Sequence, residues 1–313
     1  MSVNVNSNIL LEGFLHYIDG GYATIYYNSN THTILKVQPL YEKSGHLCSS
    51  SLTETIICKE LLHIQNPNCF RIKDFKLEEE YLLHYMPYYG KPLHEYMNTT
   101  SKLHIHSIII PTILNLLQQC ISLYEKGIQH TDIKPSNILI HEHNKVTLID
   151  YNIFSIRSSG KTKFGWSYGI GTWCYTAPEI IYFDEPSDTS MVWSIGMILA
   201  YMYNGHPLSS KIKNLYEYTE QNDWVQIYNR LKNIHKYGLS LSKDHKAIMP
   251  SRIQYIFSLC TLWNWENRPT LYELYDLLIR ILYNDLEFYS YQFKTYIKHN
   301  SIIKPYCDTE YRI

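Results

Sequence analysis

The chain has 313 residues, of which 45% are hydrophobic, so it is long enough for a large buried core and too apolar to be disordered. Its 28 Lys and Arg side chains nearly balance 29 Asp and Glu side chains, which leaves a formal net charge of −1. A charge this close to zero provides no broad electropositive surface, so we expect neither nucleic acid nor an anionic membrane as a partner.

The seven cysteines are scattered, odd in number and never spaced as a Cys-x-x-Cys pair, which argues against a disulfide framework and a zinc site. Residues 1–8 lack the features of a secretory signal, and the most apolar internal stretch, residues 191–203, is too short to span a bilayer. We therefore expect a reducing, cytoplasmic location inside a cell. Thirty tyrosines with many Asn, Ile and Lys residues indicate an AT-rich coding genome, such as that of a protist, a low-GC parasite or a large DNA virus, in which case the location would be the host cell.

The first part of the chain is predicted to be rich in β-structure. Residues 14–75 carry short β-type runs separated by Gly, Asn and Pro, with one helical stretch at residues 52–64. A further strand at residues 81–86 ends at the turn residues 87–90. The boundary between a small β-rich lobe and a larger helical lobe is expected at this turn.

The second part is predicted to be mainly helical. An amphipathic helix at residues 108–126 is closed by Gly127, and two short strands follow around a turn that contains His141. We expect that turn to be solvated, because no further metal ligand lies nearby in the sequence. Residues 191–203 are typical of a buried core helix, and residues 271–282 of an amphipathic closing helix. The predicted divisions are an N-terminal lobe at residues 1–87, a C-terminal lobe at residues 88–285 and an extension at residues 286–313.

The most informative segment is residues 130–137, together with the Asp150 that follows it. Asp132 can accept a proton from a hydroxyl group, and Lys134 can neutralise a phosphate. Asn137 and Asp150, five and eighteen residues after Asp132, supply the oxygen ligands that a magnesium ion carrying nucleotide phosphates requires. The alternative, a polar surface loop between two buried strands, is disfavoured because related motifs occur in order around the segment.

This segment resembles the catalytic loop of eukaryotic-type protein kinases, with residues 150–152 (Asp-Tyr-Asn) where that family has Asp-Phe-Gly. The resemblance covers roughly residues 14–285 and implies a bilobal α+β protein kinase fold with ATP and Mg²⁺ held between the lobes. The implied site residues here are Asp132 and Lys134 for catalysis, and Asn137 and Asp150 for the metal.

The same resemblance implies a nucleotide-binding loop near the N-terminus, where small residues let backbone amides approach phosphate oxygens. Aligned without gaps, its positions are Ile18, Gly20, Gly21 and Ala23; an ordinary hairpin turn is the alternative. Lys36, in an apolar strand, would contact the α and β phosphates and pair with a helix glutamate. Glu54 is favoured over Glu60, which lies close to Pro67; in the alternative both glutamates are solvated.

Residues 84–86, at the end of the predicted strand, align with the family's connection between the lobes. In the family this connection binds adenine through backbone groups, which here would lie near Met86, while Leu83 would face the adenine pocket. An ordinary strand end is compatible with the same residues.

Residues 171–179 resemble the Gly-Thr-x-x-Tyr-x-Ala-Pro-Glu pattern of kinases that act on proteins. The pattern favours proteins over small molecules as substrates, and Thr172 together with Lys134 resembles the serine/threonine version. The resemblance also implies an architectural ion pair between Glu179 and Arg268.

Three positions depart from the family pattern. Thr131 replaces the arginine before the catalytic aspartate, which disfavours switching by loop phosphorylation. Asn152 replaces a glycine, and Met191 replaces an aspartate that hydrogen-bonds the catalytic-loop backbone, so another group must satisfy that backbone. None of these changes removes a proton acceptor, a metal ligand or the phosphate lysine, so we expect an active serine/threonine kinase with protein substrates. The alternatives are a nucleotide-binding pseudokinase scaffold and a small-molecule kinase; the oligomeric state and the physiological substrate stay open.

Overall fold

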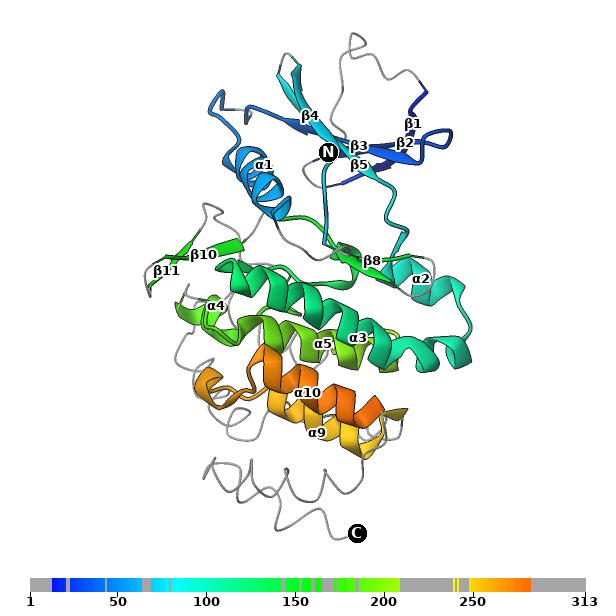
Figure 1. Cartoon of the computed structure of the whole chain (residues 1–313), viewed down its shortest axis with the longest axis vertical. Helices are drawn as coiled ribbons and strands as arrows, with labels where there is room; N and C mark the ends of the chain where they lie inside the picture. Colours follow the sequence, from blue (N-terminus) through cyan, green and yellow to red (C-terminus); the bar gives the residue numbers. More distant parts are fainter. Residues whose placement is uncertain are drawn as a thin grey trace.

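The computed structural model has a sheet-rich part and a helical part, as Figure 1 shows, which confirms the predicted bilobal α+β fold. It describes residues 13–20, 23–42, 44–63, 69–78, 80–141, 145–151, 154–158, 161–164, 172, 174–183, 186–208, 239, 241 and 248–282. The lobe boundary after residue 87 stays a prediction, and the extension at residues 286–313 lies outside the described residues.

Five antiparallel strands form the N-terminal sheet. They are β1 (Leu15–Asp19), β2 (Thr24–Asn28), β3 (Thr33–Pro39), β4 (Asp74–Glu78) and β5 (Tyr81–Pro87), in the spatial order β1-β2-β3-β5-β4. Because side chains alternate along a strand, Lys36 shares one face of the sheet with His84, its partner on β5. Val37 and its partner Leu83 lie on the opposite face, in a small apolar cluster with Leu35.

Helix α1 (Ser49–Leu61) packs on the Lys36 face of the sheet. It begins three residues before the predicted helix because the Leu52 N–H donates to the Cys48 carbonyl, so the first turn forms ahead of the apolar periodicity. Two hydroxyls fasten the helix to the strands: Ser51 donates to the Pro39 carbonyl at 3.0 Å, and Thr55 Oγ1 lies 2.9 Å from His84 Nε2. These contacts fix the distance between α1 and β3.

A short segment, residues 87–90, leads from the sheet to the helical part and is called the strap below. Its Tyr88 N–H donates to the His32 carbonyl at 3.0 Å, which extends the sheet pairing beyond β5. Gly90 adopts a left-handed φ of 88°, and any side chain there would overlap the carbonyl of Ile140. The strap then enters β6 (Lys91–Pro92) and helix α2 (Leu93–Thr99).

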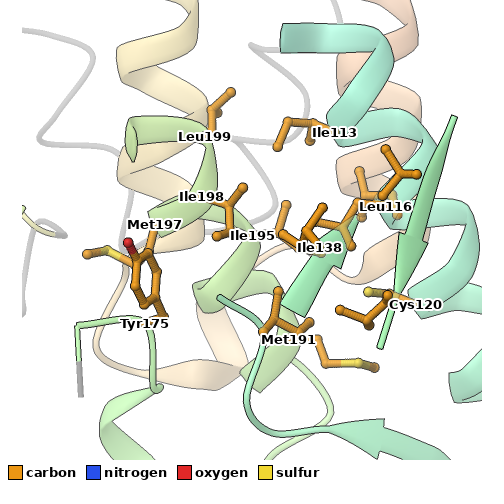
Figure 2. Packing of buried hydrophobic residues seen from close by; sticks show 14 of the residues in the cluster. Ile113, Leu116, Cys120, Ile138, Tyr175, Met191, Ile195, Met197, Ile198 and Leu199 are labelled. Atoms are coloured by element: carbon orange, nitrogen blue, oxygen red, sulfur yellow. The ribbon is translucent and has the colours of Figure 1, made fainter. Parts of the chain in front are cut away.

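The helical part is built around α3 (Lys102–Glu125) and α5 (Ser190–Asn204), which pack against each other. The other helices are α4 (Pro178–Phe183), α9 (Ser251–Cys260) and α10 (Leu271–Leu282), with α10 on α3 and α9 on α5. Figure 2 shows apolar side chains of α3 and α5 meeting in this core. Residues 190–202 of α5 are all buried, so the predicted core helix is confirmed, as is the closing helix at residues 271–282.

Helix α3 begins six residues before the predicted start at residue 108. The Ser101 side chain accepts a hydrogen bond from the His104 N–H and caps the helix, although Pro111 lies inside it. The predicted stop is confirmed, since Gly127 has a φ of 74° and its N–H donates to the Tyr124 carbonyl. Gln119 of this helix is fully buried and bonds the β9 backbone, with Oε1 accepting from the Leu148 N–H.

Over His104–Glu125, α3 is also long and apolar enough to cross a membrane by length and composition. More than half of that span is buried inside the protein, where it packs against α5 and α10. It is therefore a core helix in this fold.

Short strands and one helical turn carry the segment around Asp132. They are β7 (Ile128–His130), the 3₁₀ turn η1 (Pro135–Asn137), β8 (Ile138–Ile140), β9 (Val146–Leu148), β10 (Phe154–Ser158) and β11 (Lys161–Phe164). A second turn, η3 (Trp265–Asn267), precedes α10. The two predicted strands are confirmed as β8 and β9. Residues 142–144 of the turn between them, which was expected to be solvated, lie outside the described residues. The half-buried ring of His141 bonds Thr147 Oγ1 at 2.8 Å and packs on Tyr89.

Candidate active site

A cavity of about 310 Å³ opens where the sheet faces the helical part. The predicted residues that line it are Ile18, Gly20, Ala23, Lys36, Glu54, Met86, Asn137 and Asp150. Gly21 lies outside the described residues. Apolar side chains from both parts form the walls, with Ile25 and Ile34 from the sheet and Leu139 and Ile149 from the helical part. The volume and the apolar lining are typical of a small-molecule site.

Lys36 is the charged centre of the cavity wall. Its Nζ lies 2.6 Å and 2.7 Å from the two carboxylate oxygens of Glu54, and 3.5 Å from Asp150 Oδ1. Burial lowers the pKa of Lys36, but the two carboxylates outweigh burial and raise the pKa above its ordinary value. The lysine is therefore a cation at neutral pH. Glu54 is the partner in the structure; the side chain of Glu60 lies outside the described part.

Asp150 and Tyr151 form a tight turn at the back of the cavity. Asp150 has a φ of 69°, in the left-handed region that aspartate tolerates better than most residues. Tyr151 is fully buried, and its hydroxyl donates to the Leu148 carbonyl at 3.2 Å. The buried ring thus fixes the turn that aims Asp150 at Lys36. Asn152 lies outside the described residues.

Three donors surround the Asp132 carboxylate. The Thr172 N–H donates to Oδ1 at 2.8 Å, and Lys134 Nζ lies 2.6 Å from Oδ2. Asn137 Nδ2 donates to the Asp132 carbonyl at 2.9 Å and to Oδ2 at 3.2 Å. Because the amide nitrogen makes both contacts, the oxygen of Asn137 stays available on the cavity side.

His130 joins the Asp132 loop to the Asp150 turn. Its Nε2 lies 3.0 Å from the Ile149 carbonyl, while the Asp132 N–H donates to its Nδ1 at 3.2 Å. Since a carbonyl only accepts, Nε2 carries the proton and the imidazole is neutral. Burial agrees with this state, because it lowers the pKa of His130.

The departures at Thr131 and Met191 leave an apolar environment behind the loop. Met191 is buried, and Figure 2 shows it near Ile138 and Cys120. The Thr131 hydroxyl is buried without a hydrogen-bond partner in the described part of the chain. Because His130 accepts the Asp132 N–H, it supplies part of the backbone support that the sequence left open.

The expectation that Leu83 faces the adenine pocket is wrong. Leu83 lies opposite Val37, on the sheet face away from the cavity, because the pleat of β5 alternates its side chains. Met86, opposite Ile34, is the β5 side chain that lines the cavity. The strap after it forms the neighbouring wall, and it starts three residues later than the expected connection at residues 84–86.

The sequence interpretation missed several lining residues. They are Tyr17, Ile25, Ile34, Phe70, residues 87–90, Pro92, His94, Glu95, Ser136, Leu139 and Ile149. Two-residue alternation from Lys36 would have identified Ile34 as a lining residue. The pairing of Lys36 with Ile25 would have identified Ile25. Phe70 and His94 carried no local sign, since tertiary packing alone brings them to the cavity.

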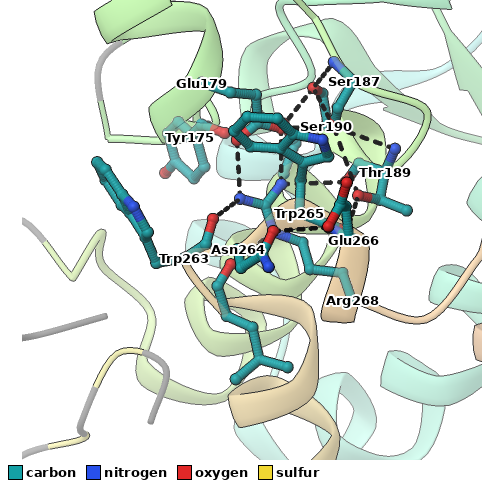
Figure 3. A network of polar contacts seen from close by, with 12 residues as sticks. Tyr175, Glu179, Ser187, Thr189, Ser190, Trp263, Asn264, Trp265, Glu266 and Arg268 are labelled. Atoms are coloured by element: carbon teal, nitrogen blue, oxygen red, sulfur yellow. Dashed lines mark hydrogen bonds and ion pairs between the residues drawn. The ribbon is translucent and has the colours of Figure 1, made fainter. Parts of the chain in front are cut away.

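The expected ion pair between Glu179 and Arg268 is present, as Figure 3 shows, and neither residue lines the cavity. Arg268 Nη1 and Nη2 meet the two carboxylate oxygens at 2.7 Å and 2.8 Å, and Ser187 and Ser190 donate to the same carboxylate. Burial raises the pKa of Glu179, but Arg268 outweighs burial and holds the pKa below its ordinary value. Both charges are fully enclosed and fully hydrogen-bonded.

Comparison with known families decides what this arrangement belongs to. A family model described as protein kinase domain matches residues 7–277. The chain belongs to the protein kinase family. Lys36, Asp132, Asn137 and Asp150 all lie within the kinase match.

Curated relatives of this kinase chain include serine/threonine-protein kinase MAK of Rattus norvegicus and of Homo sapiens. Each is 23% identical over 229 residues, which cover 68% of this chain and 36% of the relative. Serine/threonine-protein kinase grp of Drosophila melanogaster is 32% identical over 135 residues, which cover 41% of this chain and 26% of that protein. The chain thus matches little more than a third of the length of the MAK proteins.

Proposed function

We propose that this kinase chain is an active enzyme that transfers the γ-phosphoryl group of ATP to Ser or Thr hydroxyls of protein substrates. The observation that carries the proposal is the contact of Lys36 with both Glu54, at 2.6 Å, and Asp150, at 3.5 Å. In protein kinases the strand lysine must pair with the helix glutamate, and the metal-binding aspartate must be in place, before phosphoryl transfer occurs. The positions of Lys36, Glu54 and Asp150 agree with both conditions, which supports the proposal.

The nucleotide would lie in the cavity with its base against the strap. Since the Tyr88 N–H points to His32, the alternating backbone groups of Pro87 and Tyr89 point the other way and are suited to the edge of adenine. Ile18, Gly20, Gly21 and Ala23 would cover the phosphates, and Lys36 would hold the α and β phosphates. Met86 then bounds the base with its side chain, not with its backbone as the sequence suggested.

The residues at the phosphate end fit a magnesium ion. Asp150 offers a carboxylate and Asn137 an amide oxygen, and both line the cavity. Mg²⁺ prefers oxygen ligands and is commonly held by one or two carboxylates together with substrate phosphates. Within the described residues, no group of three or more His, Cys, Asp and Glu side chains could hold a metal alone, so a shared site with phosphate is the arrangement that fits. When bound, the ion neutralises phosphate charge during transfer.

Asp132 would accept the hydroxyl proton as the acceptor oxygen forms its bond to the γ-phosphorus. The bond from that phosphorus to the β-phosphate oxygen breaks, and ADP leaves. Lys134 stabilises charge on the transferring group, while Asn137 and the Thr172 N–H keep the Asp132 carboxylate oriented. These roles for Asp132 and Lys134 are part of the proposal.

The substrate class follows from the resemblance of residues 171–179 to protein-directed kinases, and the names of the MAK and grp relatives support Ser and Thr as acceptors. We also propose lobes at residues 1–87 and 88–285, an extension at residues 286–313, and a reducing, intracellular location.

The test compares phosphate transfer to a generic protein substrate by wild type and Asp132→Asn. Asp276→Asn, on the exposed face of α10, is the matched control. We expect transfer that depends on Mg²⁺, an Asp132→Asn rate lower by at least about a hundredfold, and phosphate on Ser and Thr when the products are hydrolysed. Equal background signals from wild type and Asp132→Asn would favour the pseudokinase scaffold. Phosphorylation of metabolites but never of proteins would favour a small-molecule kinase.

A further inference from the structure

Five aromatic rings run in contact from the Asp132 loop to the strap and are called the aromatic chain below. Its members, in order, are His130, Tyr151, Phe70, Tyr89 and His141. Successive ring centroids lie 4.9, 6.0, 5.9 and 5.2 Å apart, within the range of favourable aromatic contacts. The aromatic chain therefore links the segment before Asp132, the turn at Asp150 and the base end of the cavity.

Tyr89 is the member that belongs to the strap. Its hydroxyl donates to the Arg71 carbonyl at 3.1 Å and accepts from the Arg71 N–H at 3.0 Å. Both backbone groups of one residue in the loop before β4 are thus held by one side chain of the strap. These two hydrogen bonds fix the Tyr89 ring against Phe70, the neighbour of Arg71.

The strap has little freedom on either side of Tyr89. The Tyr88 N–H is bonded to the His32 carbonyl, and Gly90 is in backbone contact with Ile140. A displacement of the strap must therefore move the Tyr89 ring, and with it Phe70.

Phe70 carries the contact onward to the metal-binding end. It is buried, lines the cavity with Tyr89, and packs on the fully buried ring of Tyr151. Tyr151 follows Asp150 directly, and its position sets the turn that aims the Asp150 carboxylate. One continuous packed path thus joins the base wall to the carboxylate.

We propose that Tyr89 is a positioning residue that couples base binding at the strap to the placement of Asp150, through Phe70 and Tyr151. The inference rests on the proposed function for the roles of the strap and of Asp150. Tyr89 itself transfers no proton and contacts no phosphate. Because coupling between two sites is reciprocal, Mg²⁺ at Asp150 strengthens base binding to the same degree that base binding strengthens Mg²⁺ binding.

The test uses binding, so it does not need turnover. Affinities for ATP with Mg²⁺, ATP without Mg²⁺ and adenosine are measured for wild type, Tyr89→Leu, Tyr89→Phe and Phe70→Leu. Tyr275→Phe is the control, because it removes a hydroxyl that Gln118 contacts on α3 and α10, far from the cavity. We expect Tyr89→Leu to reduce the gain in ATP affinity from Mg²⁺ by about fivefold to tenfold, in addition to any loss of adenosine affinity, because Tyr89 also lines the base wall.

The conservative variant separates positioning from folding. Tyr89→Phe keeps the ring and should retain at least half of the gain from Mg²⁺ on a logarithmic scale. Combining Tyr89→Leu with Phe70→Leu should cost less than the two single losses multiplied, because both act on one path. If Tyr89→Leu does not fold, Tyr89→Phe alone must still show a reduced gain of about twofold or more. An unchanged gain in the folded Tyr89 variants, or an equal loss for adenosine and Mg²⁺-ATP, overturns the proposal.

The outcome separates this inference from the proposed function. A wild type that transfers no phosphate, but loses the gain from Mg²⁺ in Tyr89→Leu, contradicts the enzyme assignment and supports the coupling. A wild type that transfers phosphate, with the gain from Mg²⁺ unchanged in Tyr89→Leu, supports the enzyme assignment and contradicts the coupling. A wild type whose ATP affinity is indifferent to Mg²⁺ overturns the coupling.

Discussion

Two buried ion pairs, Lys36–Glu54 and Arg268–Glu179, have similar contact distances and different surroundings. Arg268 is bidentate on its carboxylate, and two serine hydroxyls and the Leu262 carbonyl complete the hydrogen bonds, so no position is left for a ligand. Lys36 lines a cavity and has a second carboxylate, Asp150, at 3.5 Å. A closed pair can only hold the fold together, whereas an open pair can exchange a partner for a phosphate.

The two ion pairs differ in the groups that surround them rather than in the strength of the contact between the charges. Arg268 also lies over the Trp193 ring at 5.0 Å, so removal of the guanidinium leaves both an unpaired carboxylate and an unfilled apolar contact. Glu54 is also buried, but it lines the cavity, and burial raises the pKa of its carboxyl, so it takes up a proton more readily once the cation is removed.

The largest effect is expected from Arg268→Ala. It should lower the free energy of unfolding by about 3–5 kcal/mol, because Glu179 would stay buried without its cation. Urea denaturation measures the change, with Arg280→Ala, which breaks the partly exposed pair with Asp276 on α10, as the matched control at about 0.5 kcal/mol or less. A loss for Arg268→Ala as small as that of the control would remove the distinction between the two pairs.

Lys36→Met should act on catalysis more than on stability. We expect kcat/KM for phosphate transfer to fall about 100- to 1000-fold, as when a preorganised cation or donor is removed from a transition state. The free energy of unfolding should fall less than in Arg268→Ala, because Glu54 can be neutralised from the cavity. Lys59→Met, on the same lobe and over the Phe75 ring, is the control. Full activity in Lys36→Met, with a large loss of stability, would make the open pair architectural.

The contributions of the two regions to stability should also respond differently to a fall in pH. Burial, and then Lys36, lowers the pKa of His84 from 6.5 to about 3. The unfolded chain therefore binds a proton near pH 6.5 that the folded chain refuses, and stability falls with pH from about 6.5 towards 3 by about 1.4 kcal/mol per unit. Glu179 has a lowered pKa, so its contribution persists until the pH falls below its ordinary 4.5.

The free energy of unfolding of the wild type should fall by about 2 kcal/mol between pH 6.5 and 5 because of His84, and His84→Gln should not show this loss. Denaturation at several pH values measures it, with the exposed His46→Gln as control. Parallel pH curves for wild type and His84→Gln would mean that the acid sensitivity lies elsewhere.

The smallest effect is expected from Ser187→Ala, beside the closed pair. Glu179 keeps Arg268 and Ser190, so the loss of one hydroxyl donor should cost about 1 kcal/mol. A thermal denaturation series of Ser187→Ala and Ser190→Ala measures it. A cost above about 3 kcal/mol would show that the carboxylate has no reserve of donors.

Much of the site could be predicted because its chemistry is local. Asp132, Lys134 and Asn137 lie on six consecutive residues, and the 3₁₀ turn η1 brings the amide of Asn137 back to Asp132. The apolar strand around Lys36 also carried its own sign, since a lysine there needs a partner. The choice of Glu54 agrees with the helix position that faces β3.

The rest depended on pairing between distant segments. Leu83 was assigned to the pocket by alignment, and only the register of β3 with β5 shows that it faces the other way. The start of α3 was missed because its first turns carry little apolar periodicity: among the described side chains of residues 102–107, only Ile105 is buried. Phe70 and Tyr89 meet through tertiary contacts between residues that have no shared periodicity.

Gly90 has a consequence for the choice of inhibitors. Its Cα lies against the Ile140 carbonyl, so the gap between strap and helical part is set by backbone alone. A substitution at Gly90 cannot change the width of the cavity there without moving the backbone of the strap away from the backbone of Ile140. The shape of the cavity is therefore adjusted from the opposite wall, where Ile34 and Met86 meet. A compound selective for this chain would be built outward from the contour of those two side chains, with the strap as its fixed reference edge.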